Sequence, residues 1–511
     1  MQAEDSPLVI MKAPLSHIIL LIALLWCSTA LAQSVDDAVI NAQTQYEGTA
    51  RSMAMGNATG AVGGDLTAVC INPAGLGLYR TQELTFSLAP QHQLCLTNYY
   101  GTSQYAQRFR VTVPSMGFVI TAETSNYKPL RYVQFAVGMT RTNDHNYRQQ
   151  TKGLNPTSSM VDAYLQNVND IDQAFDPDID LDEFFKNNYP YDLGPAWATY
   201  LIDRYVDDEG HFYYNSPVPQ GNVWQSDDFT SKGRSEEWTM ALAANYYDKL
   251  FLGASLGLAH LKRTSTRTYQ ETPNDTNSDF IDWEHTEDLS DNAWGVNFKL
   301  GLIYFPASWL RIGAAWHSRT AYNFAETWST DTKTTLKDSS GNAEYRRNLS
   351  PTLDWTYAFR TPHSFVGSLA FLFGQRGMIT TDVEYMDYSS SKFIFDGDNG
   401  VNSDIQDVLK PTFNLRLGTE WRARQLFLRG GLAYYGSPYG FGENYGSVKK
   451  MGLGLGYALS QTTSWDLAYE LTQSTTGYTP YRHIVDGQND VEDAIRHQWR
   501  NKLTVTLKVK L

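Results

Sequence analysis

The sequence predicts an all-β protein: a fourteen-stranded antiparallel transmembrane β-barrel with a small N-terminal hatch in its lumen and long extracellular loops. Two observations predict this fold. Apolar and polar residues alternate along segments of about 9–11 residues, the length that a tilted membrane strand needs. Tight turns and long polar links alternate between these segments, as expected when all turns face the periplasm and all loops face outside. A soluble β-sandwich has no reason to place every long loop at one end.

The composition agrees with a barrel and argues against other classes. The 511 residues are 42% hydrophobic and 13% aromatic, with 38 Gly, 32 Tyr and a formal net charge of −14. The mean hydropathy is −0.40, and past Trp26 no run of about 18 apolar residues could cross a bilayer as a helix. Nucleic acid is not an expected partner, because phosphate binding needs clustered Lys and Arg. A large all-β enzyme or lectin fits the same totals.

Residues 1–32 are predicted to be a secretory signal peptide. An apolar run at 18–26 precedes Ala30-Leu31-Ala32, which has the small residues of a cleavage site, so that Gln33 becomes the first mature residue. The acidic residues near the start of the chain suit a signal peptide poorly, so Met11 is the expected initiator. The sequence therefore predicts an exported protein.

The last strand shows the alternation most clearly. Apolar residues occupy every second position from Leu503 to Leu511, and Lys or Thr fills the positions between them. One face of such a strand contacts oil and the other contacts water or small packed groups. The same period predicts fourteen strands at 83–92, 109–121, 131–142, 236–247, 250–262, 294–305, 309–319, 364–374, 377–388, 412–422, 426–436, 450–460, 464–474 and 499–511.

The links between these strands fall into two groups. Short links are predicted at 247–249, 306–308, 375–376, 423–425 and 461–463. Long polar links are predicted at 143–235, 263–293, 320–363, 389–411, 437–449 and 475–498. An even number of strands returns the C-terminus to the periplasmic side. Residues 83–511 are therefore assigned to the barrel, with 143–235 as a long external insertion that has helical spacing around 161–185 and is expected to cap the pore mouth.

Residues 33–82 form a separate N-terminal segment. The segment is rich in small residues, has little alternation and precedes the first strand, so it is expected in the periplasm or inside the lumen. Its sequence contains Ala50-Arg51-Ser52-Met53-Ala54-Met55-Gly56-Asn57-Ala58, then Asp65-Leu66-Thr67-Ala68-Val69, then Asn72-Pro73-Ala74-Gly75-Leu76. In this order the three stretches resemble the hatch of the FadL-type long-chain fatty-acid transporter family, which includes toluene-uptake porins and relatives called hemin receptors. The family barrel has fourteen strands.

The resemblance implies a function and a location. The function would be passive uptake of hydrophobic small molecules, such as long-chain fatty acids or aromatic hydrocarbons, across the outer membrane of a Gram-negative bacterium. External loops would capture the ligand, an apolar lumen site would hold it, and it would leave sideways through a barrel wall gated by the hatch. Outer-membrane lipid and the barrel-assembly machinery are the other expected partners.

The hatch contains the predicted gate residues. Asn72 is expected to tie the hatch to the wall through side-chain hydrogen bonds, and Pro73 to stiffen the turn by fixing φ. Ala74 and Gly75 complete this predicted gate. The alternative is an ordinary Asx-Pro turn that leads into the first strand.

Five lumen-facing residues are candidates for binding a ligand head group. Arginine pairs with carboxylates through two parallel hydrogen bonds. Acidic residues share the same face, so salt-bridge ladders that fill the barrel are the competing interpretation, and a packing role is the alternative for the histidine. The five candidates are Lys299, Arg311, Arg416, Arg429 and His317.

No motif in the sequence indicates a catalytic, metal or cofactor site. There is no G-x-S-x-G, no H-E-x-x-H and no P-loop. After export only Cys70 and Cys95 remain, too few for a disulfide framework. Two alternatives to transport stay open: a barrel component, shuttle or anchor, of a protein-secretion system, and an outer-membrane hydrolase.

Overall fold

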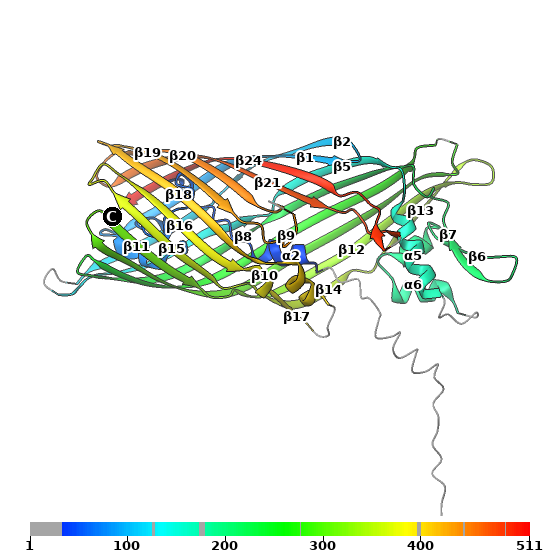
Figure 1. Cartoon of the computed structure of the whole chain (residues 1–511), viewed down its shortest axis with the longest axis horizontal. Coiled ribbons are helices and arrows are strands. Elements are labelled where there is room, and N and C mark those ends of the chain that lie inside the picture. Colours follow the sequence, from blue (N-terminus) through cyan, green and yellow to red (C-terminus); the bar gives the residue numbers. More distant parts are fainter. Residues whose placement is uncertain are drawn as a thin grey trace, which may run out of the picture.

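The computed structural model forms a closed barrel with the N-terminal segment inside it (Figure 1). The structure describes residues 33–124, 128–172, 179–275, 277–395, 400–442, 445–485 and 487–511. The predicted signal peptide at 1–32 and the expected start at Met11 lie outside the described residues. No described helix is both long enough and apolar enough to cross a membrane.

Strands make up most of the described chain. They are β1 (Glu83–Tyr99), β2 (Thr102–Thr112), β3 (Ser115–Glu123), β4 (Leu130–Asp144), β5 (Tyr147–Asn155), β6 (Asp203–Val206), β7 (Phe212–Asn215), β8 (Val223–Tyr246), β9 (Leu250–Pro273), β10 (Phe280–Ala307), β11 (Leu310–His317), β12 (Ala321–Lys337), β13 (Ala343–Leu349), β14 (Leu353–Arg360), β15 (Ser364–Leu372), β16 (Gly377–Asp387), β17 (Lys392–Ile394), β18 (Pro411–Ala423), β19 (Leu426–Tyr435), β20 (Val448–Ala458), β21 (Thr463–Tyr478), β22 (Ile484–Val485), β23 (Gln488–Asn489) and β24 (Ala494–Lys510). The helices are α2 (Val35–Ala42), α3 (Ala50–Ala54), α4 (Leu66–Ile71), η1 (Pro73–Leu78), α5 (Met160–Asp172), α6 (Leu181–Asn188), α7 (Leu193–Ala198), η2 (Tyr388–Ser390) and α8 (Val401–Val408).

The wall has fourteen antiparallel positions, which confirms the predicted fold. Five positions are built from two consecutive strands each: β2 with β3, β4 with β5, β11 with β12, β14 with β15, and β16 with β17. Single strands fill the other nine, and β24 closes the barrel against β1, pairing Glu83 with Lys510. Each of the fourteen predicted spans overlaps its own position in the wall.

The outward face of the wall forms an apolar belt. On β10 the outward side chains are Trp294, Val296, Phe298, Leu300, Leu302 and Tyr304, all exposed, while Asn297, Lys299 and Ile303 are buried on the lumen side. This arrangement is the alternation that the sequence predicted, and it matches a surface that contacts lipid.

The predicted long links are in large part strands, which corrects the sequence analysis. The 263–293 link is almost entirely the upper parts of β9 and β10, and 320–363 contains β12, β13 and β14. The 143–235 insertion likewise includes β5 and the upper part of β8. Outward residues there are polar, for example Thr264, because both faces of a strand above the bilayer contact water. These strands therefore have no apolar alternation to detect.

The predicted strand at 109–121 was also wrong in detail. The wall here consists of β2 and β3, separated by Val113 and Pro114. Proline has no N–H for a sheet ladder, so a continuous strand through Pro114 is disfavoured. The break lies in the wall next to β4.

The insertion ends in a helical cap at the end of the barrel opposite the tight turns (Figure 1). Helix α5 begins at Met160 and α6 at Leu181, within the range where helical spacing was predicted. Their apolar faces share one buried cluster with Tyr269, Phe280 and Trp283 of the upper barrel. The buried carboxylate of Glu271 holds α5 in place, accepting hydrogen bonds from the Met160 N–H (2.9 Å) and the Trp283 Nε1–H (2.8 Å).

Candidate functional site

The Asn-Pro-Ala turn of the N-terminal segment contacts the barrel wall directly. Asn72 Nδ2 donates to the carbonyl of Leu302 in β10 (3.2 Å) and to that of Gly60 (2.8 Å). A Cβ on Gly301 would lie 2.0 Å from Asn72 Oδ1, and one on Gly253 would lie 2.3 Å from the carbonyl carbon of Pro73. Two glycines in adjacent strands therefore give the turn its close approach to the wall.

The same turn is also rigid in itself. Pro73 is the first residue of η1, and Asn72 Oδ1 accepts from the N–H of Ala74 (3.1 Å). Gly75 donates to the carbonyl of Asn72 (2.9 Å) and accepts from the N–H of Gly64 (3.0 Å). An Asx-Pro turn and a tie to the wall are both present, so the gate role of these residues stays a prediction.

Ion pairs fix the rest of the N-terminal segment to the lumen wall. Arg51 pairs with Glu420 (2.9 Å), and Asp65 pairs with Lys508 (2.8 Å). Glu47 is fully buried and pairs with Lys502 and with Arg500. Arg51 and Asp65 belong to the motif stretches, so these stretches hold the segment in the lumen.

Three of the five ligand candidates, Lys299, His317 and Arg311, contact the N-terminal segment. Lys299 Nζ pairs with Glu237 (2.5 Å) and donates to the carbonyl of Cys70 (3.2 Å). His317 Nε2 lies 2.8 Å from the carbonyl oxygen of Ile71. Both residues line a small cavity of about 50 Å³ beside this segment. Cys70 and Cys95 are buried free thiols.

Two of the three arginine candidates form ion pairs with carboxylates, and Arg311 instead donates to a backbone carbonyl. Arg416 pairs with Glu384 (3.3 Å) and Arg429 with Asp466 (2.6 Å), both inside the wall. Arg311 Nη1 donates to the carbonyl of Val62 (3.1 Å). The salt-bridge interpretation thus describes the observed contacts of Arg416 and Arg429. A second cavity, of about 320 Å³, is lined by none of the five candidates. Binding of a ligand by these residues remains a prediction.

The break between β2 and β3 leaves an edge of β4 that the N-terminal segment occupies. Arg141 of β4 donates its N–H to the carbonyl of Pro114 (2.9 Å). Just beyond, Gln45 donates to the carbonyl of Thr142 (2.7 Å), and Glu47 donates to that of Arg141 (2.8 Å). Among the described strands, β2 pairs only with β1. A piece of the N-terminal segment therefore completes the wall at this point.

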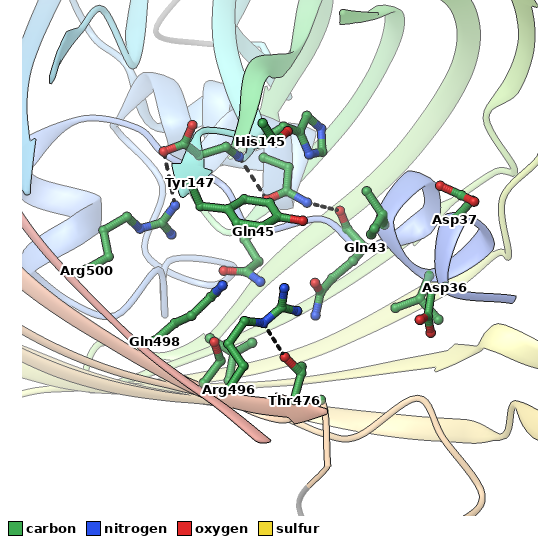
Figure 2. Close-up of a pocket in the computed structure, with 18 of the residues that line it drawn as sticks. Asp36, Asp37, Gln43, Gln45, His145, Tyr147, Thr476, Arg496, Gln498 and Arg500 are labelled. Atoms are coloured by element: carbon green, nitrogen blue, oxygen red, sulfur yellow. Dashed lines mark hydrogen bonds and ion pairs between the residues drawn. The ribbon is translucent and has the colours of Figure 1, made fainter. Parts of the chain in front are cut away.

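The cavity of about 320 Å³ lies above this contact (Figure 2). Its lining includes residues from α2, the 43–45 link, β1, β4, β5, β8, β9, β10, β20, β21 and β24. The lining is mixed, with apolar side chains beside charged ones: Val39, Ile40, Phe229 and Leu289, and Asp36, Asp37, Asp144, Arg263, Arg496 and Arg500. This lumen site is more polar than the sequence analysis expected. Its volume lies at the lower end of the range for ligand pockets, about 300–1,000 Å³.

Arg496 is one of three arginines that line this cavity, with Arg263 and Arg500. Its guanidinium points into the cavity from β24 and donates to Thr476 Oγ1 (2.8 Å) (Figure 2). It also donates to Gln149 Oε1 (2.8 Å). Within the described part of the chain, no carboxylate forms an ion pair with it. Neighbouring Arg500, by contrast, pairs with Glu47 (3.2 Å) and Asp144 (3.5 Å).

Sequence reasoning missed Arg496 because it fell in a predicted link, 475–498. A signal was present in the last strand. Lys502 and the residues after it alternate with outward leucines and valines, and the same two-residue step carried upward places Arg500, Gln498 and Arg496 on the lumen face. The apolar side of the alternation ends at Trp499, which concealed the strand's extension.

A comparison with protein families matches residues 226–494, more than half of the chain, to the outer membrane protein transport proteins (OMPP1/FadL/TodX). The chain belongs to this family. It is thus an outer membrane transport protein for hydrophobic compounds and not an enzyme, as the sequence resemblance implied. A comparison with curated proteins found no match.

Solved structures share the fold of this family member. A Pseudomonas aeruginosa FadL homologue superposes with a TM-score of 0.53 and 11% identity, covering 91% of this chain and 99% of that one. The P. putida toluene transporter TodX gives a TM-score of 0.51 and 12% identity, covering 91% of this chain and 98% of that one. At this identity the likeness concerns the fold alone.

Proposed function

We propose that this protein takes up amphipathic molecules with an apolar chain and a carboxylate head, and releases them sideways through the wall beside β4. The observation that carries the proposal is the position of the cavity. Gln45, Asn143 and Asp144 line it, and they flank the place where the N-terminal segment replaces wall pairing. A ligand in the cavity would thus lie next to the part of β4 that pairs with the N-terminal segment.

The carboxylate preference rests on Arg496. Among the described residues its guanidinium donates to the neutral side chains of Thr476 and Gln149, and it faces the cavity, so a ligand carboxylate would give it a charged hydrogen-bond partner. Charge-assisted hydrogen bonds of this kind are about twice as strong as neutral ones. The apolar side chains Val39, Ile40, Phe229 and Leu289 would contact the chain of the ligand, and each buried CH₂ contributes about 0.8 kcal/mol.

Lateral release follows from what blocks the straight path. Below the cavity, buried ion pairs join the N-terminal segment to the wall, and breaking such a pair costs about 3–5 kcal/mol. At β4, residues 43–45 are held by two hydrogen bonds, from Gln45 to the carbonyl of Thr142 and from Asn143 to the carbonyl of Gln43. Displacing only residues 43–45, with the ion pairs of Glu47 left intact, would open a path from the cavity to the outer-membrane lipid.

A cross-link tests the exit. Gln45 and Thr142 share a backbone hydrogen bond of 2.7 Å, as neighbouring strand residues do, and their Cα atoms should then be near the separation of about 4.4–6.8 Å that a disulfide accepts. We expect Gln45→Cys with Thr142→Cys, once oxidised, to bind a fluorescent long-chain fatty acid but to stop its transfer into liposome lipid. Reduction should restore transfer.

Each single cysteine variant is the matched control and should transfer the probe under both conditions. Transfer by the oxidised double variant at the wild-type rate would contradict lateral exit at this site. Toluene is the second probe. Equal affinity for toluene and the fatty acid would contradict the carboxylate preference while leaving the exit route intact.

A further inference from the structure

Three carboxylates and one guanidinium meet at the start of α2. Arg263 of β9 pairs with Asp291 of β10 (2.6 Å) and with Asp37 of α2 (3.0 Å). Glu326 of β12 is the direct cross-strand neighbour of Asp291. We call Asp37, Asp291 and Glu326 the acidic cluster. Asp291 is fully buried and Glu326 is 4% exposed, so with all three carboxylates ionised the cluster would hold more negative charge than Arg263 can balance.

The cluster also has unpartnered polar atoms. Among the residues that the structure describes, the buried Asp291 Oδ1 has no hydrogen-bond partner, and neither has Oε1 of the neighbouring Gln33. Leaving a buried charged group without a partner is costly, and such groups are normally paired. A cationic donor placed beside these oxygens would give them a partner.

Gln33 contacts the acidic cluster directly. It is only 6% exposed, and its Nε2 donates to both carboxylate oxygens of Glu326, at 3.1 and 3.2 Å. Ser34 follows as the N-cap of α2 and shares a capping box with Asp37. The side chain of Gln33 thus already lies against the acidic cluster, and its backbone nitrogen is one side-chain length away.

We propose that the acidic cluster is the binding site for the chain's own α-ammonium group, which is created at Gln33 when the signal peptide is removed. The proposal rests on the predicted cleavage after Ala32. It does not rest on the proposed ligand or exit route.

Two unfavourable charges cancel in this arrangement. An α-ammonium on the buried Gln33 needs an anion, more so because the N-terminal end of a helix repels positive charge. The cluster in turn needs a cation beyond Arg263. With the ammonium bound, two cations and the α2 N-terminus balance three carboxylates.

The consequence concerns the large cavity. Helix α2 contributes Asp36, Asp37, Val39 and Ile40 to its lining. If the new N-terminus fixes α2, that wall of the cavity becomes complete only after the precursor has been processed. Removal of the signal peptide would then finish the binding site as well as release the chain.

The test compares two forms of the full-length exported protein, purified in detergent. One is the native sequence. The other has Gly-Ser inserted between Ala32 and Gln33, which moves the ammonium by up to about 7 Å. Intact-mass measurement establishes the start of each form, and hydrogen exchange reports on the α2 amides. We expect roughly tenfold faster α2 exchange in the inserted form, as loss of one charge-assisted hydrogen bond would give.

The same insertion in a Glu326→Gln background should change α2 exchange much less, because the carboxylate that contacts Gln33 is then replaced by a neutral amide. Asp288→Asn is the matched control, because Asp288 lies on the outward face of β10, the strand that carries Asp291. It should leave the tenfold effect intact. The proposal is overturned if the native form does not start at Gln33. It is equally overturned if Gln33 is cyclised, and so uncharged, while the α2 amides remain fully protected from hydrogen exchange. It is also overturned if the insertion has no effect, or an equal effect in Glu326→Gln.

Discussion

Replacing Gly253 by alanine should separate the Asn-Pro-Ala turn from the barrel wall. The added Cβ would lie 2.3 Å from the carbonyl carbon of Pro73 and 2.4 Å from the nitrogen of Ala74. Both are backbone atoms, so no side-chain rotation can relieve the contact. The turn has to move away from β9, and the hydrogen bond from Asn72 to Leu302 should be lost with it.

The size of the effect can be worked from these contacts. Overpacking costs about 1–3 kcal/mol, and the lost hydrogen bond adds about 1 kcal/mol. The free energy that holds the turn against the wall should therefore fall by about 2–4 kcal/mol, which raises the population of displaced turns about 30- to 700-fold.

Hydrogen exchange of residues 66–78 measures this population directly. Single-channel conductance gives a second readout, because a displaced turn opens an ion path through the lumen. Gly367→Ala is the matched control, since a Cβ on this barrel glycine meets no atom within 4 Å. The reasoning is refuted if Gly253→Ala exchanges like the wild type, or if Gly367→Ala opens the turn equally.

Three further predictions concern charged groups. Lys299→Met leaves Glu237 buried without its partner and should lower the free energy of unfolding in detergent by about 3–5 kcal/mol; adding Glu237→Gln should recover most of the loss, and a single variant as stable as wild type would contradict this. Arg496→Gln should weaken calorimetric binding of hexadecanoate roughly 10- to 100-fold but leave binding of hexadecanol unchanged, whereas equal losses would contradict a carboxylate site. Burial in the external insertion raises the pKa of Asp162 from 3.8 to about 6, so the protonated form is favoured when α5 is docked. Docking should be strongest at acid pH and weaken as pH rises through about 6, making the insertion more sensitive to protease, and Asp162→Asn should abolish this pH dependence; the same pH profile in both proteins would refute it.

The part of the wall at the level of the membrane could be predicted from sequence, because lipid requires apolar residues on the outward face of each strand but not on the lumen face. Each strand from β8 to β24 that crosses the belt has apolar residues on its outward face, and the tight turns fall where this alternation stops. The turn at 247–249 between β8 and β9 lies at its predicted residues. The motif stretches around Arg51 and Asn72 likewise identified the segment that lies in the lumen.

The rest depends on interactions that no local pattern records. Above the belt, strands such as the upper β9 contact water on both faces and lose the alternation. The cavity combines residues from α2, β4 and β24, which lie hundreds of positions apart. The pairing of Glu47 with Arg141 depends on the break at Pro114, and sequence alone could mark the proline but not what fills the space beside it.

A polar lumen is compatible with hydrophobic cargo once the paths are compared. A ligand moving straight down would have to break pairs such as Lys299–Glu237 and Arg51–Glu420, each at a cost of several kcal/mol, with no polar group of its own to compensate along the chain. A ligand moving sideways displaces only residues 43–45, which are held to β4 by the hydrogen bonds Gln45–Thr142 and Asn143–Gln43, worth about 0.5–1.5 kcal/mol each. The buried ion pairs of Glu47 with Lys502 and Arg500 stay in place. The apolar chain of the ligand then contacts the surrounding lipid. The ion pairs that fill the barrel therefore favour lateral release by making the axial route the more costly one.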